Sequence, residues 1–376
     1  MKISSLQFRA LSVAIFCAIA PVSPAQTTAT TDPVGFVTVA LAANSDSYVF
    51  IPFKRTPVYA GAASAAISAN AIPVSGTPFT DSQFVYVAVT QPNHYYVFLN
   101  SGPKAGSYYS VTGNATNSVS IDANGDDLSA VIVAGTNFQI IPYDTLGTIF
   151  PVGKGVDASA GNGVGARQTE VLIPDNATAG TDLALPVSYY YNSNVTAPGA
   201  GWRKAGVSGV LANDDILYPD QFFVVRNKAA SAGNTLTFTG TVQMATLSTP
   251  VGTNAVSVNQ DNAVALPIAA NLNLAESKIW ESGAFLGSAS HGVGSRGDQI
   301  LVYDNSITGR DKGADFSYYY YTGTTAPGPG WRKAGVSGTV ADTDVIVKPG
   351  FGLVIRKKST GPVLTSIWSV KPPYVP

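Results

Sequence analysis

The feature that most constrains the fold is a long internal duplication. Residues 187–209 (VSYYYNSNVTAPGAGWRKAGVSG) and 316–338 (FSYYYYTGTTAPGPGWRKAGVSG) are identical at 17 of 23 positions. The same offset of 129 residues pairs GVGARQTEVLIPDN (163–176) with GVGSRGDQILVYDN (292–305). A chain that repeats a segment of this length is expected to build the same folded unit twice.

A third, diverged copy is expected before these two. HYYVFLNSGPKAGSYYSV (94–111) has the same order of tyrosines, glycine-proline loop and aromatic residue. A shorter lead-in, SDSYVFIPF (45–53), resembles QDNAVALPI (260–268), and the middle copy has no visible equivalent. We therefore predict a signal peptide at 1–25 and three consecutive β modules, at 26–151, 152–250 and 251–376.

Short apolar runs dominate the rest of the pattern. FVTVAL, FVYVAV, EVLIP, QILVY, FFVVR and GLVIR are β-branched or aromatic, and glycine, proline, asparagine or aspartate bounds nearly every one. The best candidates for helices, residues 60–70 and 272–282, are short. The sequence predicts an all-β fold of tandem antiparallel β-sandwich or β-barrel modules with internal repeats.

The first residues have the pattern of a secretory signal. Lys2 and Arg9 precede the apolar run LSVAIFCAIA (11–20), and SPA (23–25) supplies small residues for cleavage. The run is too short to span a bilayer. We expect export to the periplasm, the cell surface or the medium, with no transmembrane segment in the mature chain.

Removal of the signal changes the chemistry of the chain. Cys17, the only cysteine, leaves with it, so the mature protein has neither disulfides nor thiols. The remaining 20 basic and 23 acidic residues argue against a nucleic-acid partner, which requires a basic field. With only His94 and His291 as histidines, a zinc site is not supported.

Several short motifs carry a family resemblance. DPVGFVTV (32–39), TLGTIFP (145–151), PGFGLVIR (349–356) and Trp368 shortly before PPY resemble a large paralogous family of secreted proteins from Verrucomicrobium-type bacteria. The resemblance implies secretion and a shared β architecture. It implies no catalytic residues, because the family has no established activity.

One acidic loop is a candidate for calcium. Asp122, Asn124 and Asp126 place oxygen atoms at alternate positions of DANGDD (122–127), as a Ca²⁺ loop does. The spacing departs from an EF-hand, and a repeated Asx-type turn explains the acids equally well, so we favour the turn. No other cofactor is predicted.

A glycine-rich loop precedes the duplicated tyrosines. GVGSRG (292–297) matches the dinucleotide-binding pattern, but an apolar run typical of a strand follows it where that fold needs a helix. We reject a cofactor role and expect Arg167 and Arg296 to brace acidic turns.

The tyrosine runs are expected to have two different faces. Side chains alternate along a strand, so Phe316, Tyr318 and Tyr320 share one face and are predicted to be core. Asn192 stands where the other copy has Tyr321. A position that accepts asparagine is expected outside the core, so the second face is predicted to point toward solvent or a neighbour.

Outward rings of this kind are candidates for binding sugars by stacking. The candidate ligand-binding residues are Tyr319, Tyr321, Trp331, Tyr190 and Trp202. The alternative, which we favour, is that the rings only pair with one another across strands.

No catalytic constellation is visible in the sequence. We therefore predict a secreted, non-enzymatic protein of the cell surface or extracellular matrix with a structural or adhesive role, and with polysaccharide or other copies of itself as partners. The alternatives are a carbohydrate-binding β protein that uses the outward aromatics, and a secreted hydrolase with an acid pair among its aspartates.

Overall fold

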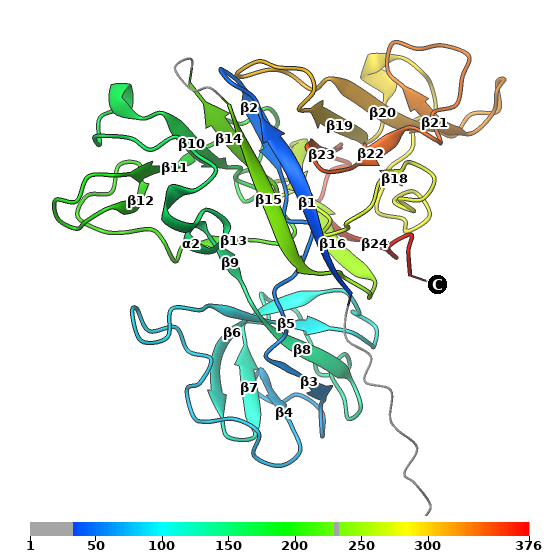
Figure 1. Ribbon diagram of the computed structural model, residues 1–376. Coiled ribbons are helices and arrows are strands. Elements are labelled where there is room, and N and C mark those ends of the chain that lie inside the picture. The colour runs from blue at the N-terminus through cyan, green and yellow to red at the C-terminus, as the bar shows by residue number, and fades with distance from the viewer. Residues whose placement is uncertain (1–32, 229–232, 376) are drawn as a thin grey trace, which may run out of the picture. The chain divides into compact units, whose positions relative to one another are not determined.

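The computed structural model describes residues 33–228 and 233–375. The predicted signal peptide at 1–25, with Cys17, lies outside the described residues. Within them the regular secondary structure is almost entirely antiparallel β-strands, and the α-helix described there, α2, is a single turn at Leu146–Ile149 (Figure 1). The prediction of an all-β fold of antiparallel modules is confirmed.

Two five-stranded sheets have the same strand order. One is ordered β12-β11-β10-β14-β2 and the other β21-β20-β19-β23-β17. The strands of the first are β2 (Asp46–Val49), β10 (Thr169–Ile173), β11 (Val187–Asn192), β12 (Gly201–Lys204) and β14 (Phe223–Asn227). Those of the second are β17 (Gln260–Val264), β19 (Gln299–Asp304), β20 (Phe316–Tyr321), β21 (Gly330–Lys333) and β23 (Phe351–Lys357).

Two further strand pairs accompany each sheet. The pairs are β1 (Val34–Leu41) with β15 (Asn234–Thr241), β9 (Asp144–Thr145) with β13 (Ile216–Leu217), β16 (Leu247–Gly252) with β24 (Thr365–Val370), and β18 (Leu272–Asn273) with β22 (Val345–Val347). We call residues 34–49 together with 144–241 repeat A, and residues 247–370 repeat B.

The first strands of the chain complete repeat A. β2 pairs with β14, and β1 pairs with β15 along its whole length (Figure 1). The pairing therefore does not follow the three consecutive segments 26–151, 152–250 and 251–376, because residues 34–49 hydrogen-bond to strands near residues 223–241. The middle copy has no visible equivalent of residues 260–268 next to it in the sequence. Its equivalent is β2, which a long insertion separates from the rest of repeat A.

The insertion forms a sheet of its own. Its six strands are ordered β3-β8-β5-β6-β7-β4 and comprise β3 (Tyr59–Ala62), β4 (Ala71–Pro73), β5 (Tyr95–Leu99), β6 (Tyr108–Ala115), β7 (Ser118–Ile121) and β8 (Asn137–Pro142). The order β3-β8-β5-β6-β7 matches the order of both five-stranded sheets. In this match β5, with its tyrosines, takes the place of β10 rather than that of the tyrosine strand β11.

Neither candidate helix forms. Residues 60–70 contribute part of β3 and then run through turns and isolated bridges, and residues 272–282 contribute β18 and turns. Alanine-rich composition alone is a weak signal, since tertiary pairing overrides helix propensity.

The central strands are buried on both faces, because each face meets a different core. Val171 and Val225 lie in the core of repeat A. Their chain neighbours Leu172 and Val224 point the other way, into a cluster shared with repeat B. This double burial explains why the runs FFVVR and GLVIR are continuously apolar rather than alternating.

The two repeats exchange equivalent contacts. Asn305 of repeat B accepts a hydrogen bond from the Tyr48 N–H at 2.7 Å and donates to the Tyr48 carbonyl at 2.9 Å. Asn176 of repeat A does the same with Ala263, at 2.8 Å in both directions. Reciprocal contacts of this kind are the mark of an isologous interface, here between two halves of one chain.

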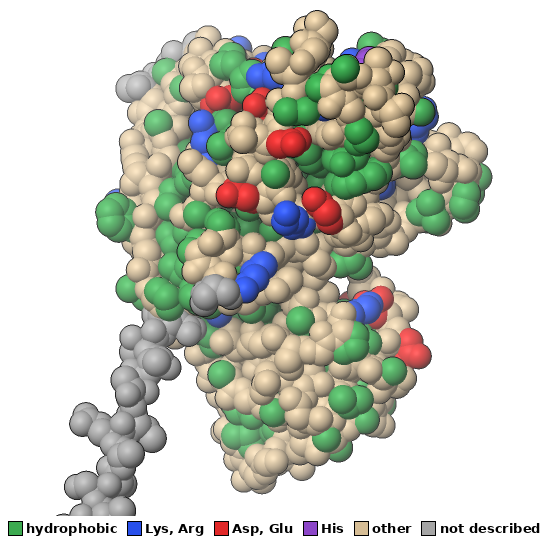
Figure 2. Space-filling view, turned by 90° about the vertical axis from the view of Figure 1, so that its right-hand side faces the viewer, with side chains coloured by type: hydrophobic (Ala, Val, Ile, Leu, Met, Phe, Trp, Pro, Cys, Tyr) green, Lys and Arg blue, Asp and Glu red, His purple; other side chains and the backbone are tan. Residues whose placement is uncertain are grey.

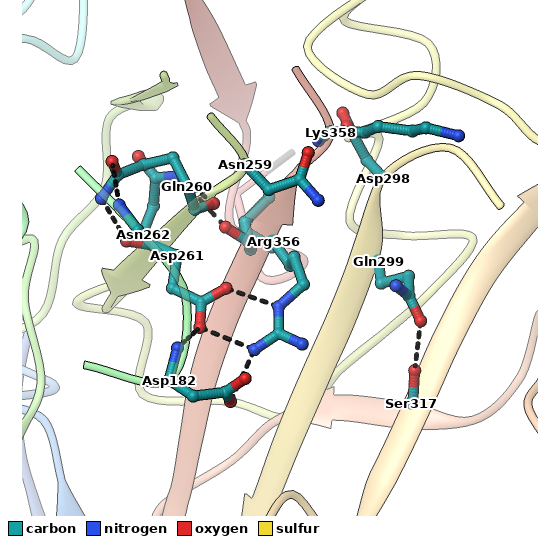
Figure 3. A network of polar contacts seen from close by, with 12 residues as sticks. Asp182, Asn259, Gln260, Asp261, Asn262, Asp298, Gln299, Ser317, Arg356 and Lys358 are labelled. Carbon is teal, nitrogen blue, oxygen red and sulfur yellow. Dashed lines mark hydrogen bonds and ion pairs between the residues drawn. The ribbon is translucent and has the colours of Figure 1, made fainter. Parts of the chain in front are cut away.

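Two arginines, one in each repeat, also make equivalent contacts between the repeats. Arg356 bonds Asp261 of its own repeat at 2.7 and 2.8 Å, and Asp182 of repeat A at 2.7 Å (Figure 3). The equivalent contacts on the other side join Arg226 to Asp46 and Asp311.

Candidate functional site

The aromatic side chains predicted to face outward are buried. Tyr319, Tyr321 and Trp331 are 3%, 4% and 3% exposed, and Tyr190 and Trp202 are 3% and 1% exposed. The prediction of an outward aromatic face is therefore wrong. Rings covered in this way offer no open face for stacking on a sugar.

The alternation of faces along β20 is nevertheless as predicted. Tyr318 lies in the core cluster that the two repeats share, and Phe316 and Tyr320 pack against that cluster. Tyr319 and Tyr321 lie on the opposite face of the strand. What covers this second face is a set of charged and polar side chains rather than solvent.

Asn192 is buried, contrary to the prediction, because both ends of its amide have hydrogen-bond partners. Its Nδ2 donates to Asn162 at 2.6 Å, and its Oδ1 accepts from the Asn194 N–H at 2.7 Å. A buried amide with partners costs little. In repeat B the same place holds Tyr321, which stacks on His291 with 4.1 Å between ring centroids.

Both tryptophans are core residues. Trp331 meets the rings of Phe285 and Tyr320 edge to face, at centroid distances of 5.0 and 5.4 Å. The Trp202 Nε1–H donates to the Phe150 carbonyl at 3.4 Å. Their place in the sequence repeat reflects packing, and neither lines the pockets described next.

Two equivalent pockets open over the second face of the tyrosine strands. Pocket A, of about 340 Å³, is lined by residues including Asn162, Arg167, Tyr190, Pro198, Arg203 and the loop 206–209. Pocket B, of about 360 Å³, is lined by residues including His291, Arg296, Tyr319, Pro327, Arg332 and the loop 335–338.

In each pocket an arginine covers the tyrosine ring. The 3₁₀ turns Val164–Ala166 and Val293–Ser295 end at Arg167 and Arg296. Each guanidinium carbon lies 4.7 Å from the ring centroid, of Tyr190 in pocket A and of Tyr319 in pocket B. In each repeat the glycine-rich loop leads into the next strand, β10 in repeat A and β19 in repeat B. The loop has the same geometry in both repeats, and it places a cation on an aromatic face.

A second arginine of each pocket is buried on the neighbouring strand. Arg203 and Arg332 lie opposite Tyr190 and Tyr319 in the strand register and are 4% and 1% exposed. Each donates to a loop carbonyl, that of Gly199 or its equivalent Gly328. Arg203 Nη1 and Arg332 Nε have no partner, and neither arginine forms an ion pair with any described residue.

The two repeats differ at one residue that contacts, or could contact, the ring-stacked arginine from outside the pocket lining. Glu170 in repeat A accepts from Arg167 Nη1 at 3.1 Å and lies 3.4 Å from Lys228 Nζ. Repeat B has Gln299 at the equivalent position; its amide oxygen accepts from Ser317 at 3.3 Å, as Glu170 accepts from the equivalent Ser188 at 3.1 Å. Arg167 therefore pairs with a glutamate of strand β10 rather than with an acidic turn, and Arg296 forms no ion pair with a described residue, so the predicted bracing of acidic turns is not what the structure shows.

These four arginines were not recognised as a site from the sequence. The identical WRK of both copies was visible, but an arginine next to a lysine at a strand end is ordinarily solvated. The available signal was alternation: Arg203 and Arg332 fall on the same face as Tyr190 and Tyr319. The pairing register that brings them together depends on the loop length, which sequence alone leaves open.

The candidate calcium residues are engaged in other contacts. Asp122 accepts from the Asn124 N–H at 2.9 Å, which forms an Asx turn. Asp126 accepts from Tyr109 at 2.8 Å and pairs with Lys104 at 2.5 Å. The described part of the chain holds no group of three or more His, Cys, Asp or Glu placed to bind a metal. Calcium binding stays an untested prediction.

Two aspartates line a small cavity between the insert and the repeats. Burial raises the pKa of Asp144 to about 6 and also raises that of Asp220, whose carboxylate accepts from Tyr108 at 2.7 Å. The cavity is about 30 Å³, room for little more than a water molecule. It is too small to hold a sugar ring.

No family model, curated protein or solved structure matches the chain. The helices between residues 33 and 375 include none that is long and apolar enough to cross a membrane. On the face drawn in Figure 2, acidic and basic side chains are sparse and interspersed. The site must therefore be interpreted from its own chemistry.

Proposed function

We propose that this is an exported, non-enzymatic protein of the cell surface or extracellular matrix with a structural or adhesive role. The observation that carries the proposal is the pair of pockets A and B, which gives one chain two copies of the same geometry. Since Arg167 of pocket A already pairs with Glu170, attachment through several weak contacts would use pocket B of several copies of the chain. Export, and the resemblance to a secreted bacterial family, belong to the same proposal.

Carbohydrate binding is the second candidate function, and the shape of pocket B favours it. The pocket is lined by a tyrosine, two arginines, a histidine, a proline and a loop rich in glycine. Polar side chains that converge on a partly apolar cleft are typical of small-ligand sites. In this candidate function the sugar binds inside the pocket. It does not stack on open aromatic rings, because those rings are buried.

Cell fractionation tests the proposed function. An antibody against the mature chain is expected to detect it in the envelope or matrix fraction, with residues 1–25 absent from its N-terminus by mass spectrometry. Recovery of the uncleaved chain from the cytosol would overturn the proposal.

A further inference from the structure

We propose that pocket B binds a carboxylate of an acidic polysaccharide, with Arg296 as the residue that grips it. This inference deepens the proposed function and rests on it for the expectation that the ligand is an extracellular polymer. In pocket A the equivalent arginine, Arg167, already pairs with Glu170 of the same repeat.

Repeat A shows, within the protein itself, the contact between an arginine and a carboxylate that we propose for pocket B. There the Glu170 carboxylate lies 3.1 Å from Arg167 Nη1, while the arginine stays stacked on Tyr190. The carboxylate is delivered by the protein itself. In repeat B the replacement of this glutamate by Gln299 removes the charge and leaves the partner to come from outside.

Arg296 is free to accept such a partner. Its guanidinium lies over Tyr319, its Nε is buried without a partner, and its two Nη groups make no hydrogen bond to the described residues. A planar guanidinium fixed against a ring and with two free N–H groups matches the geometry of a carboxylate.

Arg332 adds a buried charge that lacks a counter-ion. It is 1% exposed and donates to the carbonyls of Trp331 and Gly328, and its Nε is unpartnered. A buried cation without an anion is costly, so an anion entering the pocket regains part of that cost. None of the residues that line either pocket is acidic.

The size and rim of pocket B favour a sugar acid. About 360 Å³ is within the range of small-ligand sites of roughly 300–1,000 Å³. The exposed His291 and the Ser337 hydroxyl of the loop add polar groups for sugar hydroxyls. The chain lacks the basic field that a nucleic acid requires, and this disfavours a phosphate polymer.

Calorimetry with purified mature protein and trigalacturonate at low ionic strength tests the inference. We expect saturable binding to the wild type and at least tenfold weaker binding to Arg296→Gln and to Gln299→Glu, which supplies the internal carboxylate. The matched variant Arg167→Gln, at the equivalent position of repeat A, is expected to bind as the wild type does. Thermal unfolding of each variant shows whether it is folded.

Three outcomes would each contradict one part of these proposals. Equal binding of a neutral trisaccharide, or loss of binding in Arg167→Gln alone, overturns the role of Arg296. Equal affinity for acetate shows a small-anion site and overturns the polysaccharide. Shortening of the trimer, seen by mass spectrometry, contradicts the non-enzymatic function while leaving the binding site intact, so the two proposals fail separately.

Discussion

The Asp46 carboxylate accepts two hydrogen bonds of 2.7 Å from the guanidinium of Arg226, across 180 residues of chain. The pair joins β2 to β14 and fixes the N-terminal strand in the sheet of repeat A. Asp46 is 3% exposed, so its charge depends on this one arginine and on the Asp311 N–H.

Removal of this pair is expected to be strongly destabilising. Arg226→Ala leaves Asp46 buried without its cation and should lower the free energy of unfolding by about 3 kcal/mol. Asp311→Ala, whose side chain is 78% exposed, should change it by less than about 0.5 kcal/mol. Urea unfolding measures both. Equal effects would show that β2 is not held by the Asp46 pair.

The buried pair of Lys357 and Asp298 should behave as a coupled unit. The two are ion-paired and 8% and 0% exposed, where repeat A has the neutral pair Asn227 and Thr169 at 2.8 Å. Lys357→Met and Asp298→Asn should each cost about 3 kcal/mol, and the double variant should cost less than their sum by about 1–3 kcal/mol. Strict additivity in urea unfolding would contradict this pairing.

The aromatic rings should affect stability rather than a surface. Trp331→Ala and Trp202→Ala each empty a buried site and should lower the free energy of unfolding by about 3–5 kcal/mol. Tyr319→Phe removes only the hydroxyl contact to His291 Nδ1, 2.9 Å long, and should cost about 1 kcal/mol. Calorimetric unfolding distinguishes these values. Near-zero effects for the tryptophans would restore the idea of exposed rings.

Asp144 should make stability dependent on pH. Burial raises its pKa from 3.8 to about 6, so the folded chain binds the proton more tightly than the unfolded chain. Its contribution is full below pH 3.8 and is lost as the pH rises through 6. Asp144→Asn should therefore be more stable than the wild type by about 3 kcal/mol at pH 8, with the difference vanishing at pH 4. A difference independent of pH would contradict the shift.

Local sequence was sufficient for the strands but not for their partners. The runs that became β10, β14, β19 and β23 are apolar, short and bounded by turn residues, so their type could be predicted. The partner of β2 could not, because the insertion of the six-stranded sheet separates it from β14. The resemblance of 45–53 to 260–268 was the correct clue, assigned to the wrong copy.

The candidate site was predicted only in part. Alternation correctly placed Tyr319 and Tyr321 on one face, since it depends on backbone geometry alone. Their burial depends on which side chains the neighbouring loops, including the one before the strand, place over that face. Arg296 and His291 arrive from a loop 23 and 28 residues away, and no periodicity in the sequence encodes that contact.

The proposed binding site depends on the difference between Glu170 and Gln299. If the pairing of Arg167 with Glu170 is what keeps pocket A from binding an external carboxylate, removal of the Glu170 charge should create a second site of the kind proposed for pocket B. Glu170→Gln gives repeat A the glutamine of repeat B, and Gln299→Glu does the reverse.

Native mass spectrometry with trigalacturonate counts the sites directly. The account predicts one bound trimer on the wild type, two on Glu170→Gln and none on Gln299→Glu. An unchanged count in all three proteins would contradict it.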